Sequence, residues 1–381
     1  MRIGFDVRSF LRDETGIGVY YRNLLFALAE IDSDHHYCLF SASRRDRFDP
    51  GRLPPFRHMT FRDLAWPSRL MDFAWYRLAW PPLDTFLRCR LDLTHSPTPL
   101  ILPSRGRNIV TAHDLFFLEH PGQTDRHTRR YFVRRAARSL RRADGVIAVS
   151  HHVHARLLDL VEGLDPSRVR VIHHGTDPDF ARSVPPERLT EIRKRYRLPE
   201  KFILFVGASE PRKNLPRLIR ALPRMRRQFR AVVLVIVGRR GSDHANVMET
   251  VTREGVESRV RWLDYCPSAD LRGLYDLAEM LVFPSLCEGF GLPLLEAMAA
   301  GLPAAVANAA ALPEIAGESA LTFDPLDPED MARRIEEVLE SDALRRRLRE
   351  AGRKRSETFD WKKTAAETLS FYRDVTGAGS T

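Results

Sequence analysis

The stretch Met280-Leu-Val-Phe-Pro-Ser-Leu-Cys-Glu-Gly-Phe-Gly-Leu-Pro-Leu-Leu-Glu-Ala-Met-Ala-Ala-Gly-Leu-Pro-Ala-Ala-Val-Ala307 holds one strand–helix–strand unit. Its two ends, 280–284 and 303–307, are the short continuous apolar runs typical of strands buried on both faces of a parallel sheet. Between them, Pro293 fits the first turn of a short helix and Gly301 fits its C-terminal stop. The stretch therefore predicts a βαβ unit and an α/β fold.

The same alternation extends along the whole chain. Strand candidates lie at 2–7, 37–41, 59–64, 91–95, 108–113, 145–150 and 168–173, and again at 202–207, 231–238, 260–265, 280–284, 303–307 and 320–323. Helical patterns separate most of them, which predicts two Rossmann-like, doubly wound parallel sheets. We expect an N-terminal domain at 1–180, a linker at 181–200, a C-terminal domain at 201–355 and a final helix at 356–381. Because Trp361, Ala365, Leu369 and Tyr372 share one helical face, that helix should pack back toward the N-terminal domain.

The bulk composition is that of a soluble globular protein with two domains. The chain has 381 residues, of which 44% are hydrophobic and 29% are charged. It contains no uninterrupted apolar run long enough to span a membrane, and its start lacks an apolar signal-peptide core. Its four cysteines are scattered, so we expect a cytoplasmic protein without a disulfide framework or a zinc site. The formal charge of +10 favours anionic partners such as nucleotides, phospholipid surfaces or nucleic acid.

Two glutamates in the opening stretch are the first candidate site residues. Glu296 is the only charged residue between Glu288 and Glu314, and an acid in an apolar run is costly to bury unless it is paired. One interpretation is a helix with a single solvated acid and a capping role for Glu288. The other is a pair of carboxylates in a polar-ligand site, beside a glycine turn and a helix N-terminus that suits phosphate.

A second constellation follows another apolar strand, in Val206-Gly-Ala-Ser-Glu-Pro-Arg-Lys-Asn-Leu215. In open α/β sheets, ligands bind beyond the carboxyl ends of the strands. Arg212 offers a planar fork of donors and Lys213 a point charge, and together they match a diphosphate. The alternative is an ordinary solvated Arg-Lys pair on the surface.

Two further motifs lie in the N-terminal half. Thr15-Gly-Ile-Gly-Val-Tyr20 precedes an apolar helix and allows backbone N–H contact with phosphate, although it lacks the third glycine of a dinucleotide fingerprint. Ile109-Val-Thr-Ala-His-Asp114 ends a strand in His-Asp, where His113 could donate a hydrogen bond to a sugar hydroxyl. The alternative is a structural histidine capped by Asp114. His95 raises the same two possibilities with less support.

Two surface segments have open interpretations. The basic run 125–144 holds eight arginines with some apolar positions between them, so it is either a solvated helix face or a surface for anionic lipid. The aromatic stretch 66–80 is either an interfacial patch or part of the core or of a domain face.

With these residues identified, the chain resembles the retaining GT-B glycosyltransferases of glycosyltransferase family 4, group 1. The segment Glu288…Glu296 matches the family's E-x7-E signature, and Gly207 with Arg212-Lys-Asn214 matches its diphosphate loop. The Gly-Ile-Gly and His-Asp-Leu motifs are most similar to bacterial O-antigen mannosyltransferases. The resemblance implies two domains facing a central cleft, with the acceptor side in the N-terminal domain and the nucleotide sugar in the C-terminal one.

The resemblance also implies roles for individual residues. Arg212 and Lys213 would neutralise the departing nucleoside diphosphate, Glu288 would contact the donor sugar, and Glu296 would hold the ribose. Other donor contacts would come from Gly16, Gly18, Gly207, Phe290, Gly291 and Leu292, and His113 would touch the donor sugar. Neither a cofactor nor a metal is expected. The implied reaction is front-face substitution with retention of configuration.

We therefore expect a hexosyltransferase that uses a GDP- or UDP-hexose, with GDP-mannose as the leading candidate. Its acceptor would be a polysaccharide or a lipid-linked saccharide, and the 125–144 helix could contact an anionic membrane at its inner face. The competing interpretations are a catalytically silent relative that acts as a binding partner, and a basic nucleic-acid-binding protein, for which no recognisable module is present. Two positions depart from the family pattern: Asp264 where a strand usually ends in glycine before the base pocket, and Val19 where arginine is usual.

Overall fold

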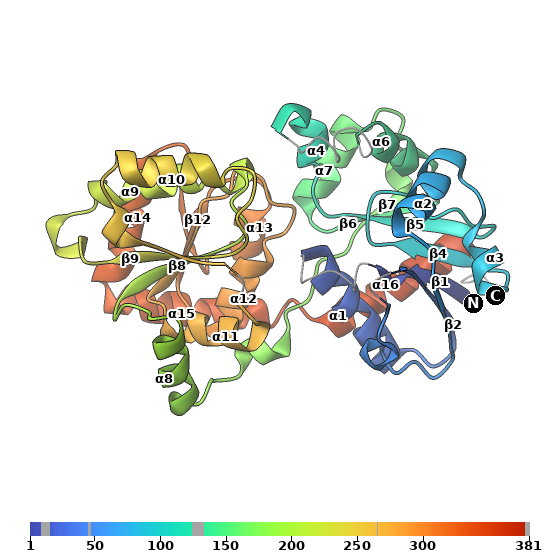
Figure 1. Ribbon diagram of the computed structural model, residues 1–381, viewed down its shortest axis with the longest axis horizontal. Helices are drawn as coiled ribbons and strands as arrows, with labels where there is room; N and C mark the ends of the chain where they lie inside the picture. Colours follow the sequence, from blue (N-terminus) through green and yellow to red (C-terminus); the bar gives the residue numbers. More distant parts are fainter. Residues whose placement is uncertain (9–15, 45–46, 124–132, 265, 378–381) are drawn as a thin grey trace. The chain divides into compact units, whose positions relative to one another are not determined.

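The computed structural model describes residues 1–8, 16–44, 47–123, 133–264 and 266–377 (Figure 1). The chain forms two compact units. The first comprises Met1–Gly175 together with Asp360–Thr381, and the second comprises Thr176–Phe359.

The first unit is built on a seven-stranded sheet in the order β3-β2-β1-β4-β5-β6-β7, in which every neighbouring pair is parallel. Its strands are β1 (Arg2–Asp6), β2 (His36–Ala42), β3 (Met59–Leu64), β4 (Leu93–Ser96), β5 (Arg107–Ala112), β6 (Gly145–Ala148) and β7 (Val169–Val171). Its described helices are α1 (Gly16–Ile31), α2 (Ser68–Phe73), α3 (Leu83–Leu87), α4 (Phe116–Glu119), α6 (Val133–Arg142), α7 (His151–Leu160) and α16 (Trp361–Thr376).

The second unit has a six-stranded parallel sheet in the order β10-β9-β8-β11-β12-β13. Its strands are β8 (Phe202–Val206), β9 (Val233–Val237), β10 (Val260–Leu263), β11 (Met280–Phe283), β12 (Ala304–Ala307) and β13 (Leu321–Phe323). Its helices are α8 (Pro186–Arg195), α9 (Leu215–Ala221), α10 (His244–Arg253), α11 (Ser268–Leu277), α12 (Leu292–Ala300), α13 (Leu312–Ala316), α14 (Pro328–Glu340) and α15 (Asp342–Ser356). In both sheets the strand order reverses once, so the predicted fold class of two doubly wound parallel sheets is confirmed.

The apolar runs that predicted the strands form the centres of the sheets. Every residue of β11 is buried, and Leu281 pairs with Leu204 of β8 on one side and Ala304 of β12 on the other. The βαβ unit of 280–307 is therefore β11, α12 and β12. A strand with neighbours on both edges and helices over both faces has no polar surface, which explains its continuous hydrophobic sequence.

The last helix belongs to the first unit. Trp361, Ala365, Leu369 and Tyr372 of α16 are buried in the core cluster that also contains α1, and the two helices run side by side (Figure 1). The chain thus leaves the first unit after Gly175 and returns to it at Asp360.

Two local features differ from the sequence-based expectation. Residues 181–200, expected as a linker, lie in the second unit, where α8 packs against α11 through contacts that include an ion pair between Arg188 and Asp270. The Gly-Ile-Gly motif does not precede its helix, because α1 already begins at Gly16. Among the described helices, none is both long and apolar enough to cross a bilayer.

Candidate active site

The reversal of strand order in the second sheet places two loops together. The chain passes from β8 to β9 on one side, and β11 later joins β8 on the other. The loops that leave the carboxyl ends of β8 and β11 therefore meet at a topological switch point, where doubly wound sheets bind ligands. The first of these loops carries Arg212 and Lys213, and the second carries Glu288.

These three side chains form a buried ion cluster. Lys213 Nζ lies 2.5 Å from Glu288 Oε1, and Arg212 Nη1 lies 3.1 Å from Glu288 Oε2. Arg212 also bonds to Glu210 through Nε, at 3.0 Å. Lys213 and Glu288 are each only 8% exposed. The sequence proposed a role for each of them, and the structure joins them in one cluster.

The cluster keeps the carboxylate of Glu288 ionised. Burial by itself would raise the pKa of Glu288, but the adjacent charges of Lys213 and Arg212 outweigh it and hold that pKa below its ordinary value. Burial also lowers the pKa of Lys213, against the opposing pull of Glu288. The second unit therefore maintains separated charges in a largely dry position, where electrostatic interactions are strong.

Asn214 ties the two loops together, and sequence reasoning gave it no role of its own. Its backbone has a φ of 58°, a left-handed conformation that asparagine tolerates better than most residues. Its side-chain amide donates to the backbone oxygens of Pro284, at 3.1 Å, and Pro325, at 2.8 Å. Arg212 adds a bond from Nη1 to the carbonyl of Cys287 at 3.2 Å. An asparagine directly after Arg-Lys at a strand-to-helix turn is the signal that could have identified it.

The turn before α12 requires glycine at one position. Gly291 has a φ of +102°, and a Cβ there would lie 2.8 Å from Leu312 Cδ2. Its carbonyl accepts the first helical bonds, from Leu294 and Leu295. The helix thus begins at Leu292, and Phe290 before it is buried against Phe359. The first N–H groups of such a helix have no partner within the helix itself and suit an oxyanion.

Glu296 lies one turn into α12 and is held by a tyrosine that sequence reasoning missed. Tyr275 of α11 donates its hydroxyl to Glu296 Oε2 at 2.8 Å. The tyrosine is 1% exposed, and burial, followed by the charge of Glu296, raises its pKa well above the ordinary value. Glu296 is therefore not a freely solvated acid.

The carboxyl ends of β8, β9 and β10 continue this edge of the sheet. Gly207 donates its N–H to Val237 at 2.8 Å, and the next loop packs so closely that a Cβ on Gly238 would lie 2.1 Å from the Gly207 oxygen. Beyond it, Arg240 Nε bonds to Asp264 Oδ1 at 2.9 Å, and both side chains are more than half exposed. Asp264, which lies where the family pattern usually has glycine, is thus paired with Arg240.

In the first unit, His113 follows β5 and lies in a cluster of neutral rings. Its ring centroid is 4.7 Å from that of Tyr20 and 5.4 Å from that of His174. Burial lowers the pKa of His113 to about 4 and that of His174 well below the ordinary range. His113 Nε2 lies 3.0 Å from the Pro97 oxygen. Because a carbonyl can only accept, Nε2 carries the proton, and Nδ1 is left as an acceptor. The hydrogen bond to a sugar would therefore run from the hydroxyl to His113, the reverse of the direction suggested by the sequence.

His95 has a structural role. It is fully buried between Tyr372 Oη, 2.6 Å from Nδ1, and Thr111 Oγ1, 2.7 Å from Nε2. These bonds connect α16 to the sheet, and burial lowers the pKa of His95 to about 3.

The two glycines of the Gly-Ile-Gly motif lie at the start of α1. Gly16 opens the helix in an exposed position, where a Cβ would meet no atom of the described residues within 4 Å, and Gly18 is buried in the first turn. The residues before Gly16, including Thr15, lie outside the described part of the chain. Gly16 and Gly18 thus contribute backbone at the start of a helix, which is compatible with an approach to phosphate.

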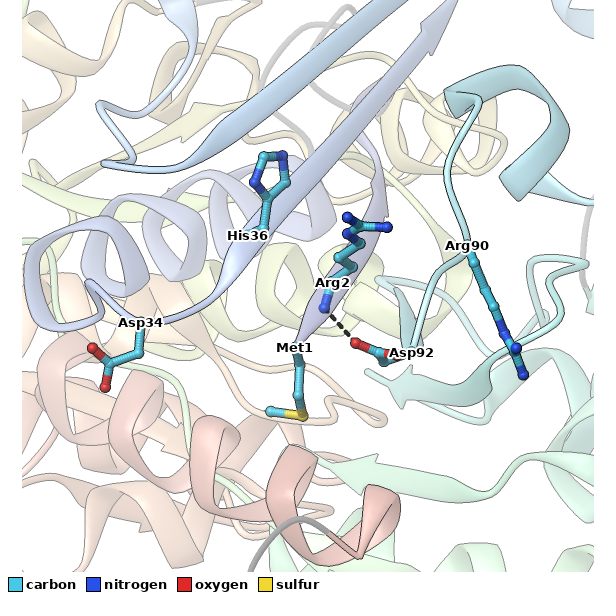
Figure 2. A pocket seen from close by; sticks show the side chains of 6 residues that line it. All are labelled: Met1, Arg2, Asp34, His36, Arg90 and Asp92. Carbon is cyan, nitrogen blue, oxygen red and sulfur yellow. Dashed lines mark hydrogen bonds between the residues drawn. The ribbon is translucent and has the colours of Figure 1, made fainter.

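A hollow of about 390 Å³ lies elsewhere on the first unit (Figure 2). Arg2, His36, Arg90 and Asp92 are among its lining residues, and the Arg2 backbone N–H donates to Asp92 at 2.7 Å. Arg2 and His36 are the first residues of β1 and β2, so the hollow is at the amino edge of the sheet. It is therefore distinct from the carboxyl-edge positions that carry the candidate site residues.

Comparisons with known proteins agree with this geometry. Residues 15–180 match the model of "Glycosyltransferase Family 4", and residues 189–355 match that of "Glycosyl transferases group 1". The chain belongs to this glycosyltransferase family. The glycosyltransferase is 29% identical to O-antigen chain mannosyltransferase B of Escherichia coli, over 98% of its own length and all of the relative's.

Solved structures show the same GT-B fold. The glycosyltransferase aligns over its full length with sucrose-phosphate synthase from Thermosynechococcus elongatus, with a TM-score of 0.78 and 22% identity, covering all of that chain. It also aligns with Anabaena HepE in complex with UDP-glucose, with a TM-score of 0.72 and 20% identity, over 97% of this chain and 99% of the other.

Proposed function

We propose that this glycosyltransferase transfers a hexose from a nucleotide sugar to a polysaccharide or a lipid-linked saccharide, with retention of configuration. GDP-mannose is the leading donor, because the full-length relative is an O-antigen chain mannosyltransferase. UDP-glucose is the alternative, since a protein of the same fold is known in complex with it.

The observation that carries this proposal is the Lys213–Glu288–Arg212 cluster at the switch point. A buried lysine and a partly buried arginine are suited to a diphosphate, and the Glu288 carboxylate balances their charges. When a nucleoside diphosphate binds, its oxygens replace Glu288 as the ion-pair partners of Lys213 and Arg212. The Glu288 carboxylate is then available to the donor sugar. The cations then stabilise the charge that develops on the leaving phosphate.

The remaining residues position the donor around this centre. Glu296, oriented by Tyr275, accepts hydrogen bonds from the ribose hydroxyls. The backbone amides of Gly207, Phe290, Gly291 and Leu292 bind phosphate and sugar oxygens. In the first unit, we propose that the helix start at Gly16 and Gly18 offers amides to phosphate and that Nδ1 of His113 accepts a sugar hydroxyl.

The proposed reaction is front-face substitution. The bond between the anomeric carbon and the phosphate oxygen breaks while the acceptor hydroxyl oxygen bonds to the same face of that carbon. The hydroxyl proton passes to the departing phosphate, so charge and atoms balance without a cofactor. Arg212 and Lys213 supply the positive charge, and we propose that no divalent metal is needed.

We further propose that the enzyme works at the inner face of a membrane, where lipid-linked acceptors are found. The sequence suggested the basic segment 125–144 as the contact. Of that segment the structure describes α6 from Val133 onward, in which Arg138, Arg141 and Arg142 are exposed.

Release of nucleotide from GDP-mannose and UDP-glucose in the presence of EDTA tests the function. We expect one donor to be turned over, activity to persist in EDTA, and the product to retain the anomeric configuration by NMR. Tight nucleotide binding with no turnover of any donor would indicate a catalytically silent relative. Binding of an oligonucleotide without either nucleotide would reject the transferase.

A further inference from the structure

Exposed apolar side chains gather in one segment of the first unit. Ten large hydrophobic side chains are exposed among the described residues, and five of them lie within fifteen positions. These five are Trp66, Leu70, Phe73, Leu78 and Trp80, with exposed fractions of 46%, 55%, 51%, 61% and 67%. We call them the apolar face. Single exposed hydrophobic residues are common on proteins, but such a concentration marks an interaction surface.

The segment that carries the apolar face is anchored to the first unit. It consists of α2 and a π-helical turn, Ala74–Leu78. Met71 and Trp75 point inward and are at most 2% exposed, and the Trp75 indole donates to the Pro81 oxygen at 2.9 Å. The guanidinium of Arg8 lies 5.1 Å from the Trp75 ring centroid. The segment is therefore apolar on both sides, although the core of the unit covers only one of them.

The charges around the apolar face favour a negatively charged partner. The only acid between residues 64 and 82 is Asp72, and its Oδ1 lies 2.9 Å from Nη1 of Arg8, which also pairs with Asp6. The exposed Arg77 places its guanidinium 5.9 Å from the Phe73 ring centroid. The sequence between residues 64 and 82 thus has two arginines, Arg69 and Arg77, against the single acid Asp72, which leaves an excess of positive charge beside the apolar side chains.

We propose that the apolar face docks on a bilayer that contains anionic phospholipid. Trp66 and Trp80 have the amphipathic rings that are enriched at the headgroup level. Leu70, Phe73 and Leu78 would enter the boundary of the acyl chains. Arg77 would pair with lipid phosphates.

This surface differs from the basic helix suggested by the sequence. In the described part of that segment, Ala136 and Leu140 are fully buried, so α6 presents arginines to solvent but no apolar anchor. Such a helix attracts an anionic surface from a distance, whereas the apolar face provides insertion. The two surfaces therefore make opposite predictions for salt: binding through arginines is lost at high ionic strength, and binding through inserted side chains persists in part.

A matched pair of leucines tests the proposal by vesicle cosedimentation. Leu78→Glu removes an insertion residue, and Leu326→Glu changes an equally exposed leucine of the second unit, which is 59% exposed. With vesicles of phosphatidylcholine and phosphatidylglycerol, we expect Leu78→Glu to lower the partition coefficient about tenfold and Leu326→Glu to leave it unchanged. Pure phosphatidylcholine should bind the unmodified protein more weakly. Nucleotide affinity, measured by calorimetry, should be equal in all three proteins if they are folded.

Quenching of tryptophan by brominated lipid gives a direct readout of insertion. We expect quenching in the unmodified protein and its loss in the Trp66→Phe/Trp80→Phe variant, because Trp75, Trp262 and Trp361 stay in the protein. The proposal is overturned if the protein does not bind vesicles or if Leu78→Glu binds them normally. It is equally overturned if Arg138→Gln/Arg142→Gln alone abolishes binding. A dimer that dissociates in Leu78→Glu, without vesicle binding, would assign the face to a second copy of the chain instead.

Discussion

The carboxyl edges of the two sheets carry opposite kinds of chemistry. In the second unit, Lys213, Arg212 and Glu288 hold full charges in a buried cluster. In the first unit, His113 and His174 are kept neutral, stacked on each other. The two cations of this cluster are the reason why we propose that the second unit binds an anion such as a diphosphate. Neutral rings with an acceptor nitrogen are suited to an uncharged, hydroxyl-rich sugar.

The largest expected effect is on the charged side of this comparison. We expect Lys213→Ala to lower turnover about 10³-fold, because it removes a preorganised cation from the leaving phosphate. The measurement is the rate of nucleotide release at saturating donor. Lys201→Ala, which changes an exposed lysine just before β8, is the matched control and should be silent.

Because Lys213→Ala leaves Glu288 with one cation fewer, its fold has to be tested separately. The double variant Lys213→Ala/Glu288→Gln removes the unbalanced charge and should regain thermal stability but not turnover. A double variant that regains both would show that Lys213 affects turnover only by stabilising the fold. The charged cluster of the second unit would then have no direct role in catalysis.

The neutral side of the comparison predicts a loss of stability in mild acid. Burial lowers the pKa values of His95 and His113 to about 3 and about 4, from an ordinary value of 6.5. At a pH between the lowered pKa of each histidine and 6.5, the unfolded chain binds more protons than the folded one. The contribution of these two histidines to the free energy of unfolding is therefore fully present above about pH 6.5, and it is lost as the pH falls toward 4. For His95 alone, we expect a loss of ~2 kcal/mol between about pH 7 and pH 5.

Tryptophan fluorescence can follow this loss in the first unit alone. Trp262 is the single tryptophan of the second unit, so a Trp262→Phe variant reports only on the first. Urea unfolding should show a decline in the free energy of unfolding over this pH range. His113→Gln should make the decline shallower, while a change at the exposed His58 should not.

For Glu288, whose pKa is lowered, stability is lost only at pH values below the ordinary range of a glutamate. A first unit with no pH dependence above pH 5 would contradict the neutral environment of its histidines.

The sequence predicted the fold well because parallel strands that are buried on both faces must be continuously apolar, as β8 and β11 are. It also predicted the members of the charged cluster, since Arg212 and Lys213 follow an apolar strand and Glu288 lies beside a glycine turn that leads into a helix. It did not predict that Lys213 and Glu288 bond directly, because that depends on which strands are neighbours. Nor did it identify Asn214 or Tyr275, whose roles arise from contacts between distant elements.

A smaller effect is expected on the choice between the guanine and uracil bases of the nucleotide, which would be made in the second unit. Asp264, held by Arg240, lies at the carboxyl end of β10, beyond the β8 loop that carries Lys213. A carboxylate can accept both N–H donors of the guanine edge, whereas uracil presents an oxygen in one of those positions. We expect Asp264→Ala to reduce the preference for GDP over UDP about tenfold, as measured by calorimetry. Asp243→Ala, which changes another acid near the end of β9, is the control. An unchanged ratio would separate base choice from this ion pair.

The smallest expected effect concerns Tyr275, which holds Glu296, the residue that we propose binds the ribose. Its hydroxyl donates to Glu296, so Tyr275→Phe removes one hydrogen bond while the buried ring keeps its packing. We expect about a fivefold rise in the KM for the donor with kcat nearly unchanged, because one neutral-to-charged hydrogen bond is lost and Glu296 is less well oriented. Tyr196→Phe serves as the structural control, because it removes a hydroxyl that donates to Asp270, which lies on α11 as Tyr275 does. If both variants lose stability equally and neither changes KM, then Tyr275 is a packing residue and Glu296 needs no orientation from α11.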